Sequence, residues 1–232
     1  DYSSAVDTLT GIGVLEGLDF AISENSKMTR ADFIALVMHL YCGGKHTEFA
    51  SDVKFADIPD GAAYLWAVRG AYEAGFINGR ANGSFMPNVS VSYSEAVTII
   101  ISALGYGAKA QANGGYPTGY LTVAAGLGLD DIAFADANAL TMGETAKLIL
   151  DALNTEVLDV DSIGTKSVKY KARKNETWLS KAFDILKCEG VVDGNSLTGL
   201  YGAGTSLRKN QLRIDGKAYD ATANFDSLIG MN

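Results

Sequence analysis

Three segments of the chain share one local pattern, in which a Ser or Thr is followed three residues later by an acid at the start of an apolar run. The three pairs are Thr29 with Asp32, Ser92 with Glu95, and Thr141 with Glu144. Each pair is a capping box, whose side chains satisfy backbone donors at the start of a helix. The apolar residues that follow predict core helices over residues 28–41, 92–104 and 140–153.

A shorter helix and a glycine-containing loop precede each capped helix. The clearest copy is residues 64–104, where a helix ends at Gly75 and a loop around Asn82–Gly83 has Phe85 as its apolar anchor. We expect Phe20 to play the part of Phe85 in the first copy, and Phe55 to pack on the core before the second. Repetition of this kind largely decides a fold.

We place the three repeats at residues 1–42, 55–106 and 116–155, with a glycine-rich, irregular linker over 106–119. After residue 164 the composition changes. Residues 1–164 carry 8 Lys and Arg against 20 Asp and Glu, whereas residues 165–232 carry 11 against 7. Such a shift in charge indicates a domain boundary.

Residues 165–232 read as a small β-rich domain. Residues 184–194 and 210–221 are typical of strands, and Asp215–Gly216 between alternating runs predicts a hairpin. Residues 155–164 are either a short strand or a linker. The predicted fold is therefore mainly α, a pseudo-threefold cluster of three helix–loop–helix repeats, with a β-rich C-terminal segment, and α+β overall. We expect the chain to be a piece of a longer protein.

Charge, hydropathy and motifs exclude several classes of function. A net charge of −8 argues against a nucleic-acid partner, and the sequence has no apolar run long enough for a membrane span. Cys42 and Cys188 form no disulfide framework and no metal motif, and His39 and His46 lack zinc-ligand neighbours. Acidic residues near 130–136 and 159–161 fit no calcium loop. We find no catalytic motif, and predict no enzyme, no metal site and no cofactor.

The repeats resemble the S-layer homology (SLH) domain family of Gram-positive surface proteins. The matching residues of the second copy are Phe55, Asp57, Trp66–Ala67, Gly75, Gly79, Asn82–Gly83, Phe85, Pro87, Ser92, Glu95 and Ala96. In the first copy they are Gly13–Val14–Leu15–Glu16–Gly17 and Met28–Thr29–Arg30–Ala31–Asp32. The third copy is looser, and the resemblance extends to about residue 155.

This resemblance implies an extracellular protein of the cell wall or S-layer, anchored without a covalent bond. In the family, grooves between repeats bind a secondary cell-wall polysaccharide that often carries a pyruvate ketal, and other S-layer subunits are further partners. The resemblance makes Arg30 a principal contact to the acidic sugar, with Asp32, Asp57, Trp66 and Glu95 as further polysaccharide-binding candidates.

Each of these candidates has a second interpretation. Arg30 is either an anion receptor beside free helix N–H groups or a plain solvated arginine. Trp66 either stacks on a sugar or packs in the core, and Asp57 either closes a helix or lines a groove. The positions equivalent to Arg30 hold Tyr93 and Met142, which cannot pair with an anion.

Three functions remain open on the sequence. The first is a cell-wall anchor or S-layer module that binds an acidic polysaccharide. The second is a degenerate SLH cluster that serves in assembly or packing without binding the polymer. The third is the targeting module of a larger exported enzyme.

Overall fold

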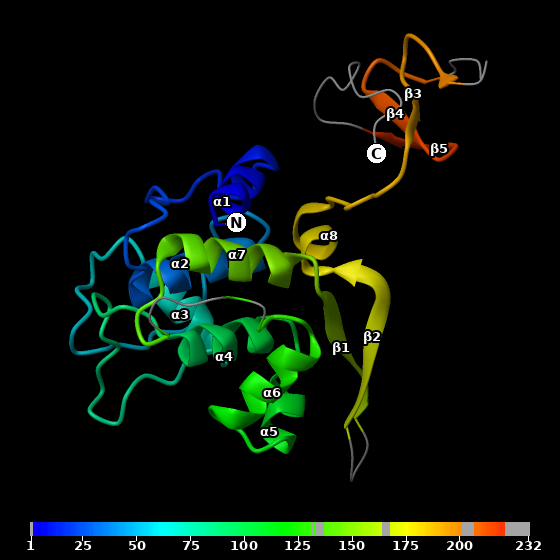
Figure 1. Cartoon of the computed structure of the whole chain (residues 1–232). Coiled ribbons are helices and arrows are strands. Elements are labelled where there is room, and N and C mark those ends of the chain that lie inside the picture. The colour runs from blue at the N-terminus through cyan, green and yellow to red at the C-terminus, as the bar shows by residue number, and fades with distance from the viewer. Residues whose placement is uncertain (1, 131, 133–136, 164–167, 201–206, 221–232) are drawn as a thin grey trace. The chain divides into compact units, whose positions relative to one another are not determined.

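The computed structural model describes residues 2–130, 132, 137–163, 168–200 and 207–220, with side chains left out of the description for 159–175. The chain divides into two compact units, Asp1–Ile185 and Leu186–Asn232. The described part is mainly helical, with small antiparallel sheets towards the C-terminus, which confirms the predicted fold class (Figure 1). The first unit extends beyond residue 165, where the composition changes.

All eight described helices lie in the first unit. They are α1 Tyr2–Gly11, α2 Arg30–Tyr41, α3 Leu65–Glu73, α4 Tyr93–Ala103, α5 Gly107–Ala112, α6 Thr118–Gly126, α7 Met142–Leu153 and α8 Trp178–Phe183. The same unit holds the antiparallel pair β1, Glu156–Ile163, and β2, Val168–Thr177. Residues 155–164, left open between strand and linker, thus contain a strand.

The predicted caps begin the three long helices α2, α4 and α7. Ser92 and Thr141 form complete capping boxes with Glu95 and Glu144. At α2 the Thr29 side chain accepts a hydrogen bond from the Asp32 N–H, and its hydroxyl donates to the Asp32 carboxylate. Of the two bonds of a capping box, only the one from the Asp32 N–H to the cap side chain forms at α2, because the Asp side chain is one methylene shorter than that of Glu.

The segments that enter these three helices are joined in a closed ring of backbone hydrogen bonds. The N–H of Met28 donates to the carbonyl of Leu140 at 2.9 Å, that of Leu140 to Val91 at 3.0 Å, and that of Val91 to Met28 at 2.9 Å. We call this the backbone ring. It holds the three helix starts together although Met28 and Val91 are 63 residues apart along the chain, and Val91 and Leu140 are 49 residues apart.

The ring also corrects one expectation about the loops. Phe85 lies six residues before Val91 and is fully buried. The residue six before Met28 is Ile22, so Ile22 rather than Phe20 occupies the corresponding place. Both Phe20 and Ile22 are partly buried against the core.

Two further segments differ from the sequence-based expectation. Residues 106–119, expected to be an irregular linker, contain α5 and the start of α6. Residues 184–194, expected to be one strand, begin with Asp184, which ends α8 in the left-handed conformation at φ 57°. Only Val192–Gly194 of that run is a strand.

Strand β1 is attached to the helical core at the end of α4. The N–H of Leu158 donates to the carbonyl of Leu104 at 2.9 Å. At Gly105, with φ 89°, an added Cβ would lie 2.0 Å from the Leu158 carbonyl oxygen, so only glycine fits there. The hairpin therefore belongs to the helical unit.

The C-terminal unit contains a three-stranded antiparallel sheet in the order β3-β4-β5. Its strands are β3 Val192–Gly194, β4 Gln211–Ile214 and β5 Lys217–Asp220. Asp215 and Gly216 have φ of 45° and 80°, as a two-residue type I′ turn requires. This confirms the predicted hairpin.

Candidate functional site

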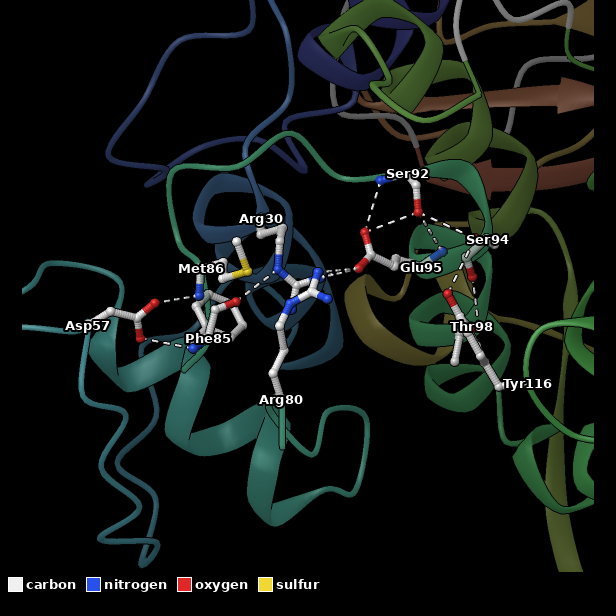
Figure 2. A network of polar contacts seen from close by, with 10 residues as sticks. All are labelled: Arg30, Asp57, Arg80, Phe85, Met86, Ser92, Ser94, Glu95, Thr98 and Tyr116. Atoms are coloured by element: carbon white, nitrogen blue, oxygen red, sulfur yellow. Dashed lines mark hydrogen bonds and ion pairs between the residues drawn. The ribbon is translucent and has the colours of Figure 1, made fainter. Parts of the chain in front are cut away.

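Arg30 is the first residue of α2, and its side chain crosses to the loop before α4. Its Nε donates to the Phe85 carbonyl at 2.9 Å, and its Nη1 donates to Glu95 Oε1 at 2.8 Å (Figure 2). The guanidinium carbon lies 4.9 Å from the centroid of the Phe85 ring. The side chain is only 10% exposed. Arg30 is thus a nearly buried, bonded cation rather than a plain solvated arginine.

Glu95 is shared between its helix cap and two arginines. One carboxylate oxygen accepts from the Ser92 N–H at 3.1 Å, which completes the capping box. The other accepts from Arg30 and, at 3.4 Å, from Nη2 of Arg80, whose side chain is 48% exposed. We call Arg30, Arg80 and Glu95 the guanidinium cluster. Two cations share this one carboxylate, and the charge of Asp57 also acts on Arg30.

Burial and the carboxylate act in opposite directions on Arg30. Burial lowers its pKa, the nearby Glu95 carboxylate raises it and Arg80 lowers it, and the net shift is downward. An arginine pKa is so high that the group stays charged at neutral pH. Arg30 is therefore a cation at neutral pH.

Asp57 holds the loop that Arg30 contacts. Its two carboxylate oxygens accept from the N–H groups of Phe85 at 2.8 Å and Met86 at 2.7 Å (Figure 2). The slight burial of Asp57 raises the pKa of its carboxyl group. The two N–H donors and the nearby charge of Arg30 together lower this pKa by more, so the net shift is downward. Asp57 thus fixes the backbone whose carbonyl binds Arg30.

The same position after the cap makes a similar contact in the other two copies. The Tyr93 hydroxyl donates to the Leu129 carbonyl at 3.1 Å. The Met142 sulfur accepts from the Ser23 N–H at 3.3 Å. In each copy the side chain that follows the cap reaches the backbone of a neighbouring loop. Part of the contact made by Arg30 is therefore structural, whatever else it binds.

Asp32 and Trp66 line a separate concavity of about 400 Å³, the aromatic groove. Its other lining residues include Phe20, Tyr64 and His46. The His46 and Trp66 rings lie 4.9 Å apart and are tilted by 46°. Trp66 is partly buried, so it packs against the core and also borders the groove.

The five predicted residues thus fall into two groups. Arg30, Glu95 and Asp57 meet around the Phe85 loop, whereas Asp32 and Trp66 meet in the aromatic groove. Tyr64, which also lines the aromatic groove, is close enough to both groups to respond to their charges. Its pKa is raised by burial and then by the charges of Asp57 and Asp32.

Sequence reasoning missed two side chains of the cluster region. Arg80 is the second arginine on Glu95, and the exposed Tyr116 has its hydroxyl 3.5 Å from the Ser94 hydroxyl (Figure 2). Arg80 was overlooked because its GRANG segment reads as backbone geometry. The sequence around Tyr116 contains no motif that predicts its contact with Ser94 at the start of α4.

Among the described residues we find neither a candidate metal site nor a helix that could span a membrane. No three of their His, Cys, Asp and Glu side chains are grouped to hold a metal ion. None of the described helices has the length and apolar character that crossing a membrane requires. Cys42 and Cys188 are free thiols.

Comparison with known proteins identifies the middle of the chain. Residues 54–97 match the family model of the S-layer homology domain. This segment contains α3, the Phe85 loop and the start of α4, and hence Asp57, Arg80 and Glu95.

Three relatives are similar to larger parts of the chain. The middle cell wall protein of Brevibacillus brevis is 27% identical over 80% of this chain and 17% of its own length. The cell surface protein of Thermoanaerobacter kivui is 30% identical over 65% of this chain and 19% of its own. The exoglucanase XynX of Acetivibrio thermocellus is 31% identical over 42% of this chain and 9% of its own. The chain thus spans less than a fifth of the length of these relatives.

Proposed function

We propose that the chain is an extracellular module that anchors its protein by binding an acidic cell-wall polysaccharide. The match of residues 54–97 to the S-layer homology domain and the similarity to a cell wall protein and a cell surface protein support this. The polymer carries carboxylates, such as those of pyruvate ketals. These contact the guanidinium cluster, and neighbouring sugar rings occupy the aromatic groove. Other S-layer subunits are further partners. We also propose that the chain has no catalytic role of its own.

The observation that carries this proposal is that two guanidinium groups, one fixed and one half exposed, meet at a single carboxylate. Arg30 is held in place by Phe85 and Glu95, so it loses little conformational freedom when it meets an anion. Arg80 is half exposed and brings a second guanidinium, which can hold a carboxylate with two hydrogen bonds. The hydroxyls of Ser94 and Tyr116 lie beside the cluster and suit sugar hydroxyls.

The aromatic groove supplies the apolar part of sugar recognition. Trp66 and Tyr64 present ring surface to a concavity whose volume lies in the range of small-ligand sites. Asp32, whose carboxylate accepts from Thr29, offers an acceptor for a sugar hydroxyl. The described lining of this groove includes Asp19 and Asp32 but no Lys or Arg, so it suits the neutral parts of the polymer.

Co-sedimentation of the full chain with purified cell-wall sacculi tests the proposal. We expect the wild-type chain to pellet, and to stay in solution when the non-peptidoglycan polymer has been extracted. Arg80→Gln should weaken pelleting and its dependence on salt, because screened charge–charge attraction is lost. Arg208→Gln, at an exposed arginine of the second unit, is the matched control. Equal pelleting with extracted and intact sacculi would refute the proposal.

A second candidate function is packing or assembly without polymer binding. It is favoured by Arg30, two of whose nitrogens already have protein partners, and by the equivalent interface contacts of Tyr93 and Met142. On this account Arg80→Gln leaves pelleting unchanged. The anchoring account predicts a loss.

A third candidate follows from the similarity to an exoglucanase. In that relative, the segment similar to this chain makes up only 9% of the length of a protein named as an exoglucanase. The chain would then target a catalytic domain to the wall. The full-length sequence tests this candidate, because a catalytic constellation elsewhere in it would favour targeting over a lattice role.

A further inference from the structure

A second concavity of the first unit surrounds Arg69 and is separate from the two groups of residues described above. It has a volume of about 560 Å³, and its walls include Phe55, Ile58 and Leu65. Three charged side chains line it, those of Lys54, Asp60 and Arg69. We call it the Arg69 pocket.

The Nε of Arg69 is buried and has no hydrogen-bond partner among the described residues. The two terminal nitrogens of the same guanidinium are not among the buried unpartnered atoms, so they face solvent. A buried charged donor left unsatisfied is costly, and native structures seldom keep one without a reason. Arg30 in the same unit shows the ordinary solution, with a carbonyl on Nε and a carboxylate on Nη1.

The charge around Arg69 leaves a cation in excess. Lys54 and Asp60 are 3.8 Å apart, and their side chains are 73% and 84% exposed. Such an exposed ion pair is weak and rearranges readily. The pocket therefore has two cations and one anion along its lining, with apolar walls that strengthen the attraction for an incoming anion.

We propose that the Arg69 pocket binds a carboxylate of an acidic sugar. The Arg69 guanidinium receives the carboxylate, Lys54 adds a second cation, and the sugar ring packs on the apolar wall. That the sugar belongs to the cell-wall polymer rests on the proposed function. It gives the polymer a contact point additional to the guanidinium cluster and independent of the motif arginine.

The two anion sites border one loop, which explains how a single polymer reaches both. Gly83 lines the Arg69 pocket and accepts a hydrogen bond from the Ala56 N–H at 3.2 Å. Two residues further on, the carbonyl of Phe85 holds Arg30. The loop is fixed by Asp57, so the spacing between the two sites is set by the fold.

The test uses the full chain, labelled with ¹⁵N, and follows the Nε–Hε resonance of Arg69 by NMR. Trigalacturonate is the acidic probe, maltotriose the neutral one and tri-aspartate the peptide one. We expect trigalacturonate to shift the resonance saturably and maltotriose to leave it in place. Arg69→Gln should weaken trigalacturonate binding about tenfold, which corresponds to one lost charge-assisted contact. Arg208→Gln should bind as wild type does.

Three outcomes overturn the proposal. They are no shift with trigalacturonate, an equal shift with maltotriose, and a response to tri-aspartate alone, which would point to a protein partner. Since Arg69 has no bond to lose, Arg69→Gln should keep the helical circular dichroism of the wild type. Sacculus pelleting is read separately. Pelleting without an Arg69 shift refutes this pocket alone, whereas an Arg69 shift without pelleting refutes the anchoring function alone.

Discussion

The ion pair between Arg30 and Glu95 predicts an asymmetric response to its two partners. Glu95→Gln keeps a helix-capping side chain but leaves Arg30, with a 10% exposed side chain, without its carboxylate. Arg30→Met leaves Glu95, which is 22% exposed and keeps Arg80 as a partner at 3.4 Å. Methionine suits the site, since Met142 holds the equivalent position and is 8% exposed. Removing the acid should therefore cost more than removing the base.

The exposure of the pair sets the magnitude. Breaking a fully buried pair costs about 3–5 kcal/mol, and an exposed pair contributes about 0–1 kcal/mol. The intermediate exposure of Arg30 and Glu95 places the cost of Glu95→Gln at about 2 kcal/mol and that of Arg30→Met at about 1 kcal/mol. The double variant should cost about as much as Arg30→Met alone, because the only charge left without its partner is that of Arg80, which is 48% exposed.

Urea denaturation followed by far-ultraviolet circular dichroism measures these values. The described helices all belong to the first unit, so the helical signal reports the unit that contains the pair. Ser94→Ala, beside the cluster but outside the ion pair, is the matched control. A cost below about 0.5 kcal/mol for Glu95→Gln, or purely additive single variants, would refute the reasoning.

Two further predictions concern the histidine and glycine positions of the first unit. Burial lowers the pKa of His39, outweighing its hydrogen bond to the Val14 carbonyl. Its stabilising contribution is therefore complete above the ordinary histidine pKa of about 6.5 and is lost as the pH falls through the lowered value. His39→Gln should reduce the fall in urea midpoint between pH 7.5 and 5.5, and an unchanged fall contradicts this. Gly105→Ala should destabilise by about 2 kcal/mol or more, from its positive φ and the clash with Leu158. Gly83→Ala, with a positive φ but open space, should cost about 1 kcal/mol; equal urea midpoints would show that the clash is absent.

The helix starts could be predicted because their signals are local. Thr29, Ser92 and Thr141 each act within three residues of the chain, so the caps are legible in the sequence. The same holds for the Asp215–Gly216 turn. Helix α5 was missed although Ala and Lys favour helices, since the flanking glycines dominate that segment.

The site was less predictable because its contacts are distant in sequence. Glu95 lies 65 residues from Arg30, and Arg80 reaches the same carboxylate from the loop before α4, 15 residues away. The motif identified Arg30 and Glu95 as candidates but could not show that they bind each other. Likewise, the sequence could not show that Arg69 Nε lacks a hydrogen-bond partner in the described part of the chain, because this depends on where the neighbouring residues lie in the fold.

The backbone ring has a consequence for how the three copies can change over evolutionary time. Its bonds join N–H and carbonyl groups of Met28, Val91 and Leu140, which every residue except proline supplies. Assembly of the copies therefore places little demand on the side chain that follows each cap. Arg30, Tyr93 and Met142 therefore occupy equivalent positions while the same backbone bonds join the three helix starts.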